Sequence, residues 1–121
     1  MKDRRKVKRR YLLYYARIYD RESHQQIGNL VDITPSGAMI LSPSAFPVGK
    51  VLRLQIELTD DIAAQPYLEV EGKVKWTQPD IEPQTYNLGI EFIQVTEEDK
   101  KIIEKIIALY GFRDNILSKQ D

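Results

Sequence analysis

The stretch LEVEGKVKW, residues 68–76, alternates two kinds of residue more regularly than any other part of the chain. The charged set consists only of Glu and Lys, and the other set is Leu68, Val70, Gly72, Val74 and Trp76. Successive side chains of a strand point to opposite faces of a sheet, so this pattern predicts a strand with one buried and one solvated face. The alternation places Trp76 in the same set as Val74.

Further runs of strand character lie on both sides of this stretch, separated by polar or Pro- and Gly-containing turns. They are residues 11–19, 26–33, 38–41, 52–58 and 87–92. In the run 52–58, Gln55 belongs to the polar, solvated set. The sequence TPSG at residues 34–37 predicts a turn, because proline presets φ near about −65° and Gly37 tolerates a positive φ.

The chain closes with one amphipathic helix. Thr96 and Asp99 have the spacing of a capping box, in which the Thr hydroxyl accepts from the amide three residues on. A face of apolar residues follows, and Gly111 is the predicted stop. The residues of that face are Ile102, Ile103, Ile106, Ile107 and Tyr110.

These elements predict an all-β domain with a C-terminal helix: six short strands about ten residues apart favour a small antiparallel barrel or sandwich capped by the helix. A length of 121 residues fits one such domain. The chain has no Cys, no apolar stretch near the roughly 18 residues that span a bilayer, and no signal-peptide pattern. We therefore expect a cytoplasmic protein without membrane insertion.

Catalytic patterns are scarce. The single histidine, His24, lies in a polar loop, and we interpret it as a solvated turn residue. The chain contains neither of the glycine-rich phosphate-binding motifs, G-x-x-x-x-G-K-[ST] and G-x-G-x-x-G. The acidic clusters at residues 60–61 and 97–99 have ordinary explanations as loop carboxylates and first-turn helix residues. The sequence thus predicts no enzyme, no metal site and no cofactor.

Binding chemistry is concentrated in the basic arm MKDRRKVKRR, residues 1–10. It holds seven Lys or Arg and one Asp, which leaves eleven basic and seventeen acidic residues in the remaining 111. Arg5 and Arg9 face the same way in a helix or an extended chain, and guanidinium groups suit phosphates and guanine. Arg10 shares the spacing with Lys6, so the register is open. The alternative interpretation is a basic tail that is simply solvated or that binds nucleic acid nonspecifically.

The turn at residues 32–37 adds complementary groups at one strand end. The Asp32 carboxylate suits the N–H groups of guanine, Thr34 and Ser36 offer hydroxyls, and Gly37 allows close approach. A plain β-turn is the alternative interpretation.

Arm and turn together resemble the PilZ domain family, which carries R-x-x-x-R in an N-terminal arm followed by [DN]-x-S-x-x-G. The matching residues are 5–9, with Arg4 completing a doubled arginine, and 32–37, where Thr34 stands at the serine. Residues 72–76 resemble the family's G-x-V-x-W strand and residues 89–92 its G-[IV]-x-F strand, so the resemblance covers about residues 4–110.

The resemblance implies a six-stranded antiparallel β-barrel (a PilZ-like split barrel) with a C-terminal helix, and cyclic di-GMP as ligand. The implied ligand site comprises Arg4, Arg5, Arg9, Asp32, Thr34, Ser36 and Gly37, with Arg10 as the alternative to Arg9. We expect a flexible arm (residues 1–10), a barrel with its helix (11–111) and a tail (112–121).

The predicted function is that of a cyclic di-GMP receptor whose arm changes conformation on binding and so signals to a downstream protein partner. Two alternatives stay open: a PilZ-like interaction adaptor with weak or lost nucleotide binding, and, less favoured, nucleic-acid binding through the arm. If the chain is a cyclic di-GMP receptor, we expect no DNA or RNA partner.

Overall fold

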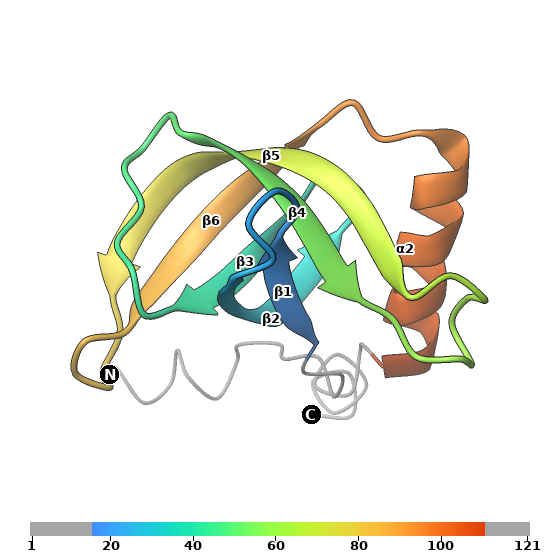
Figure 1. Cartoon of the computed structure of the whole chain (residues 1–121), viewed down its shortest axis with the longest axis horizontal. Helices are drawn as coiled ribbons and strands as arrows, with labels where there is room; N and C mark the ends of the chain where they lie inside the picture. The colour runs from blue at the N-terminus through green and yellow to red at the C-terminus, as the bar shows by residue number, and fades with distance from the viewer. Residues whose placement is uncertain (1–15, 111–121) are drawn as a thin grey trace, which may run out of the picture.

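The computed structural model describes residues 16–110 of the chain, which form a strand-rich body followed by one helix (Figure 1). The strands are β1 (Arg17–Asp20), β2 (Gln26–Thr34), β3 (Gly37–Ser42), β4 (Val51–Glu57), β5 (Tyr67–Pro79) and β6 (Tyr86–Ile93). The helix is α2 (Glu97–Tyr110).

The six strands form a closed barrel in the order β1-β2-β3-β6-β5-β4, and every neighbouring pair is antiparallel. Closure gives each strand a neighbour on both sides, although the last part of β5, residues 74–79, pairs with β6 alone. The predicted fold class, a six-stranded antiparallel barrel with a C-terminal helix, is therefore confirmed.

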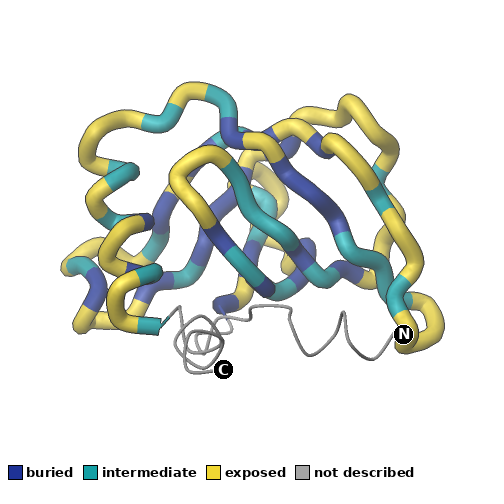
Figure 2. Tube along the Cα trace, turned by 180° about the vertical axis from the view of Figure 1, so that it is seen from behind, coloured by how far each residue is buried: buried dark blue, intermediate teal, exposed yellow. Residues whose placement is uncertain are grey.

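The barrel interior is filled by aliphatic side chains from every strand. Figure 2 shows where the buried positions lie along the chain. Fully buried examples are Ile18, Leu30, Ile40, Leu54, Ile56, Leu68, Val74 and Leu88. The helix α2 stands at one end of the barrel and contacts β2 and β5 (Figure 1). Its Ile103 and Ile106 are completely buried with the strand residues, so the helix covers that end of the core.

The capping box at the start of α2 is present. The Asp99 amide donates to the Thr96 Oγ1 at 3.0 Å, and the Thr96 amide donates to the Asp99 Oδ2 at 3.2 Å. These bonds satisfy backbone donors that the first turn leaves unpaired. The predicted helix start is thus confirmed.

All six predicted strands are present, with boundaries that differ by a few residues. The first predicted strand began at residue 11, but residues 11–15 lie outside the described part of the chain. β5 continues to Pro79, three residues beyond the prediction. The proposed arm, residues 1–10, and tail, residues 112–121, also lie outside the described residues, so these boundaries stay a prediction.

Polar Gln55 departs from its expected solvent exposure. It lies on the outer face as the alternation predicts, yet only 7% of it is exposed. Its Nε2 donates to the Glu69 Oε2 at 2.8 Å, whereas its buried Oε1 has no hydrogen-bond partner among the described residues. Among residues 16–110, no helix is long and apolar enough to cross a membrane.

Candidate functional site

A surface groove of about 380 Å³ lies on the outside of β2, β3, β5 and β6. We call it the β2–β5 groove. It is lined by Asp32, Ile33, Thr34, Ser36, Gly37, Ala38, Met39, Lys75, Trp76, Gly89, Ile90 and Glu91.

Strand register arranges the outward residues of this groove in two rows that cross all four strands. The first row runs from Asp32 through Met39 and Gly89 to Trp76. The second row runs from Thr34 through Gly37 to Glu91, and continues to Lys73, which lies beyond the groove lining. Residues that are almost sixty positions apart in the sequence thus share one face of the sheet.

A β-bulge in β2 directs Asp32 outward. Val31 is an extra residue between the register pairs of Leu30 and Asp32. Leu30 is fully buried, so a regular strand would turn Asp32, two residues on, into the core as well. The bulge reverses this orientation and gives a charged side chain a place on the surface.

A second bulge, in β5, does the same for Trp76. Lys75 is the extra residue here, Val74 is fully buried, and Trp76 is 38% exposed. The predicted grouping of Trp76 with Val74 on one face is therefore wrong. The inserted residue breaks the period-2 pattern, so the indole lies in the groove instead of the core.

The Trp76 indole lies directly over Gly89 of β6. A Cβ at position 89 would come within 2.2 Å of the indole Cε2 and Nε1 atoms. Only a residue without a side chain permits this contact. Gly89 therefore allows the flat ring to lie across the strand at one side of the groove.

The loop between β2 and β3 consists of Pro35 and Ser36, because Thr34 already pairs with Gly37. The Ser36 amide donates to the Thr34 Oγ1 at 3.2 Å, and the two hydroxyls lie 3.5 Å apart. Both side chains are exposed at the groove. The turn thus presents two neighbouring hydroxyls to the surface.

Gly37 does not adopt the positive φ that was predicted for it in the turn. Among the described glycines only Gly49 has a positive φ, so Gly37 does not use its left-handed freedom. A Cβ at position 37 would instead come within 2.1 Å of the carbonyl oxygen of Ile90 on β6. The glycine allows β3 and β6 to approach closely beside the turn.

The charged groups of the groove are Asp32, Lys75 and Glu91. Asp32 is half-buried, and its Oδ1 accepts the Ile33 amide at 2.9 Å. The Lys75 Nζ lies 3.4 Å from the Glu91 Oε1, and both side chains are more than half exposed. The described lining therefore holds two carboxylates and one ammonium group.

The structure thus brings together four of the residues expected to bind ligand: Asp32, Thr34, Ser36 and Gly37 all line the β2–β5 groove. The other expected residues, Arg4, Arg5, Arg9 and the alternative Arg10, lie outside the described residues. The ligand contacts of both groups stay a prediction.

Sequence reasoning missed the remaining outward residues of the groove. They are Met39, Lys75, Trp76, Gly89 and Glu91. An unusual glycine within the predicted strand 87–92 was the available signal, because a strand glycine often marks close approach of another group.

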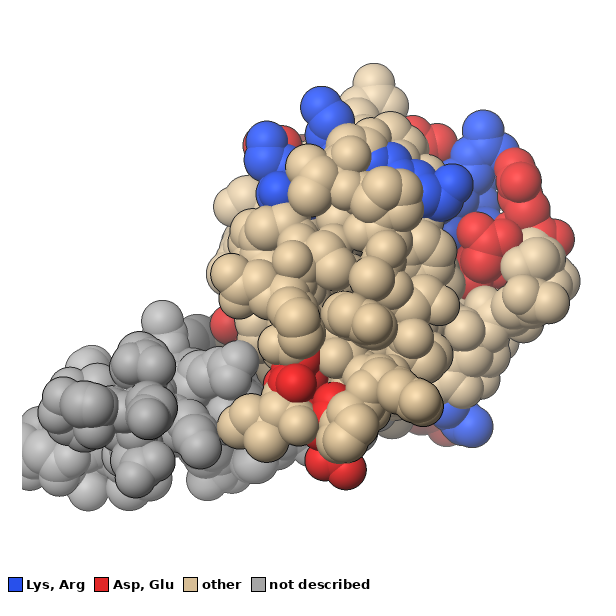
Figure 3. All heavy atoms as spheres, turned by 90° about the vertical axis from the view of Figure 1, so that its left-hand side faces the viewer, with Lys and Arg blue, Asp and Glu red and all other residues tan. Residues whose placement is uncertain are grey.

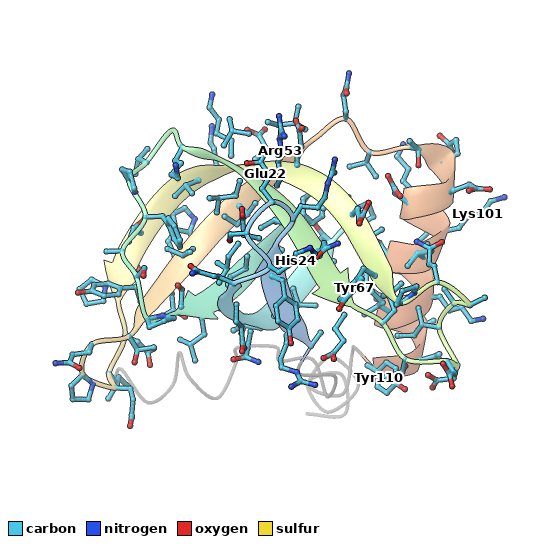
Figure 4. All side chains as sticks on the ribbon, viewed as in Figure 1. Glu22, His24, Arg53, Tyr67, Lys101 and Tyr110 are labelled. Atoms are coloured by element: carbon cyan, nitrogen blue, oxygen red, sulfur yellow. The ribbon has the colours of Figure 1, made fainter. Side chains whose placement is uncertain are left out.

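The other residues considered for chemistry lie away from this groove. His24 lies in the exposed β1–β2 hairpin with a φ of 62°, and an ion pair between Glu22 and Arg53 joins that hairpin to β4 (Figure 4). Among the described residues no cluster of His, Cys, Asp or Glu has the arrangement of a metal site.

Asp61 lies outside the β2–β5 groove and takes part in a contact between a loop and the helix α2. The Tyr110 hydroxyl at the end of α2 donates to the Asp61 Oδ2 at 2.5 Å, and Thr59 also donates to this carboxylate. Hydrogen bonds from Thr59 and Tyr110 lower the pKa of Asp61 below 3.8. The bond to Asp61 raises the pKa of Tyr110 above 10.0.

The fold is that of a small closed β-barrel domain with a groove on its outer surface. The profile of the PilZ domain family matches residues 3–109, and the chain belongs to this family. PilZ domains are a family of cyclic di-GMP receptors and are binding domains rather than enzymes.

Two solved structures are similar to this chain. The inhibitor of motility MotI/DgrA of Bacillus subtilis is 16% identical with a TM-score of 0.65; the match covers 84% of this chain and 49% of that one. The chain thus spans about half the length of that protein. The PilZ domain with cyclic di-GMP of YcgR from Escherichia coli is 13% identical with a TM-score of 0.61; the match covers 93% of this chain and 95% of that one. At these identities the likeness shows the fold. No curated protein matches the chain in sequence.

Proposed function

We propose that this chain is a receptor domain for cyclic di-GMP, with the β2–β5 groove as its guanine-binding surface. The observation that carries the proposal is the convergence of Asp32, Thr34, Ser36 and Gly37 with an exposed Trp76 in one groove. A carboxylate accepts from the N1–H and N2–H groups of guanine, and an indole face offers a stacking surface for a base. The similar PilZ domain of YcgR was solved with cyclic di-GMP, which supports the same ligand here.

The charge of the groove supports a role for the basic arm. Asp32, Glu91 and Lys75 give the described lining a net charge of about −1 at neutral pH. Because the ligand carries two negative phosphodiesters, its binding needs additional cations. We propose that Arg4, Arg5 and Arg9, or Arg10 in the alternative register, supply them when the arm closes over the groove. Arm closure would then signal to a downstream protein partner.

Calorimetric titration with cyclic di-GMP tests the proposal. We expect binding at micromolar ligand concentrations in the full-length chain. Replacing Arg5 and Arg9 together by Ala should weaken binding about 100-fold, because each lost charge-assisted bond costs roughly 1.5–3 kcal/mol. Asp32→Ala should weaken it at least tenfold. No heat from the wild-type protein would exclude a receptor function.

A second candidate, an interaction adaptor, is favoured by one end of the barrel. Loops 43–50 and 80–85 lie at this end, and Val48 and Ile81 are 66% and 80% exposed there. Viewed from that side, the central surface is uncharged, with Lys and Arg side chains mainly along the top and Asp and Glu both beside them and at the lower edge (Figure 3). Such a surface suits a protein partner. Absence of nucleotide binding in the titration would favour this candidate.

Nucleic-acid binding through the basic arm makes a different prediction. The affinity for nucleic acid should fall steeply as salt is raised, and Asp32→Ala should leave that affinity unchanged.

A further inference from the structure

We propose that the ion pair of Lys75 and Glu91 sets the affinity of the β2–β5 groove for its anionic ligand. In this proposal the Lys75 ammonium group attracts the ligand phosphates, whereas the Glu91 carboxylate repels them and competes for Lys75. The inference rests on the proposed function and assigns these two residues opposite effects on ligand affinity.

Glu91 lines the groove beside the β2–β3 turn. It pairs in register with Gly37, so its carboxylate projects from the strand next to the β2–β3 turn. The Phe92 amide that follows donates to the Ser36 carbonyl oxygen at 2.9 Å, which holds this part of β6 beside the turn. A negative charge therefore lies next to the hydroxyls of Thr34 and Ser36, where the ligand is proposed to bind.

Lys75 reaches the same place because of the bulge in β5. It is the extra residue between the pairs of Val74 and Trp76, and its side chain is 53% exposed. Its Nζ lies 3.4 Å from the Glu91 Oε1. Among the described residues that line the groove, Lys75 is the one with a positive charge.

The pair is suited to exchange partners. Exposed ion pairs contribute little to folding, because water already solvates both charges. The Lys75 ammonium group can therefore leave Glu91 for a phosphate oxygen without destabilising the barrel. Glu91 then remains as an uncompensated negative charge close to a ligand with two phosphodiesters.

Charge-neutralising variants test the proposal by titration with cyclic di-GMP. Glu91→Gln should strengthen binding about 3- to 10-fold, and Lys75→Gln should weaken it by a similar factor, as expected for one charge a few ångströms from another near a protein surface. Both differences should shrink as salt is raised, because exposed charges are screened. The thermal midpoints of both variants should match the wild type.

Two variants control for the change in overall charge. Glu82→Gln alters the β5–β6 hairpin at the other end of β6, and Lys101→Gln alters a residue of α2 that points away from the barrel (Figure 4). Each should leave affinity within about twofold of the wild type.

The outcomes separate this inference from the proposed function. If the wild type binds and Glu91→Gln binds equally well, the inference is wrong and the receptor function stands. If the wild type does not bind but Glu91→Gln does, the inference is supported and the receptor function of the native chain is not. If neither binds at millimolar ligand, both proposals fail.

Discussion

Two glycines determine the shape of the β2–β5 groove at the scale of single residues. Gly37 lets the β3 backbone approach the Ile90 carbonyl oxygen, and Gly89 lets the Trp76 indole lie on β6. Neither position needs a positive φ. Both glycines are therefore required by close contact across strands, which is a property of the assembled barrel and not of the local chain.

Gly89→Ala tests the role assigned to Trp76. The added methyl group would overlap the indole, so we expect the exposed ring to swing out while the fold persists. Affinity for cyclic di-GMP should fall about tenfold, within the roughly 1–3 kcal/mol that stacking on one base contributes. Tryptophan fluorescence should report the more solvated ring. Unchanged affinity with a displaced ring would show that Trp76 does not contact the ligand.

Gly37→Ala should affect folding itself, because the new Cβ meets backbone and not a flexible side chain. We expect a loss of about 1–3 kcal/mol or more in the free energy of unfolding, measured by urea denaturation. Ser36→Ala is the matched control, since Ser36 is exposed in the turn and should cost less than about 0.5 kcal/mol. Equal stability of the two variants would contradict the close strand contact.

At the scale of elements, the two bulges explain what the sequence could and could not predict. Strict alternation held in β6, where Leu88, Ile90 and Phe92 are all buried. It failed at Trp76, because the inserted Lys75 leaves no mark in the hydrophobic pattern. A bulge is specified by packing and twist across neighbouring strands, which a single stretch of sequence does not contain.

The candidate site was predictable in part for the same reason. Asp32, Thr34, Ser36 and Gly37 are contiguous, so a local motif identified them. Gly89 and Glu91 join them only through the register between β3 and β6, strands separated by more than forty residues. Long-range register depends on the closure of the whole barrel.

Thr96→Ala tests the capping box that starts α2. Loss of the hydroxyl leaves the Asp99 amide without its acceptor, so unfolding should become easier by about 0.5–2 kcal/mol in urea. Thr96→Ser keeps the hydroxyl and should retain most of the stability. If Ala and Ser were equally stable at position 96, the hydrogen bond would contribute nothing.

At the scale of the whole molecule, the Tyr110–Asp61 hydrogen bond joins the end of α2 to the loop between β4 and β5 (Figure 4). Its two groups titrate at opposite ends of the pH range. The lowered pKa of Asp61 gives stabilisation that is present above about pH 4 and is lost as pH falls through the folded pKa. The raised pKa of Tyr110 gives stabilisation that is present below about pH 10 and is lost as pH rises through the folded value.

Tyr110→Phe removes this contact without changing the size of the ring. We expect its thermal midpoint to lie below that of the wild type between about pH 4 and pH 10. The difference should narrow in more acidic and more alkaline solution, as followed by circular dichroism. A constant difference at every pH would show that the hydroxyl acts independently of the Asp61 charge.

The central claim is that the barrel receives cyclic di-GMP at the β2–β5 groove. Chemical-shift mapping of the ¹⁵N-labelled full-length protein tests it most directly. On addition of cyclic di-GMP, we predict the largest amide shifts at residues 32–34, 36–39, 75–77 and 89–91, together with the Trp76 indole N–H. Shifts confined to α2 or the β1–β2 hairpin, or no shifts at millimolar ligand, would contradict the account.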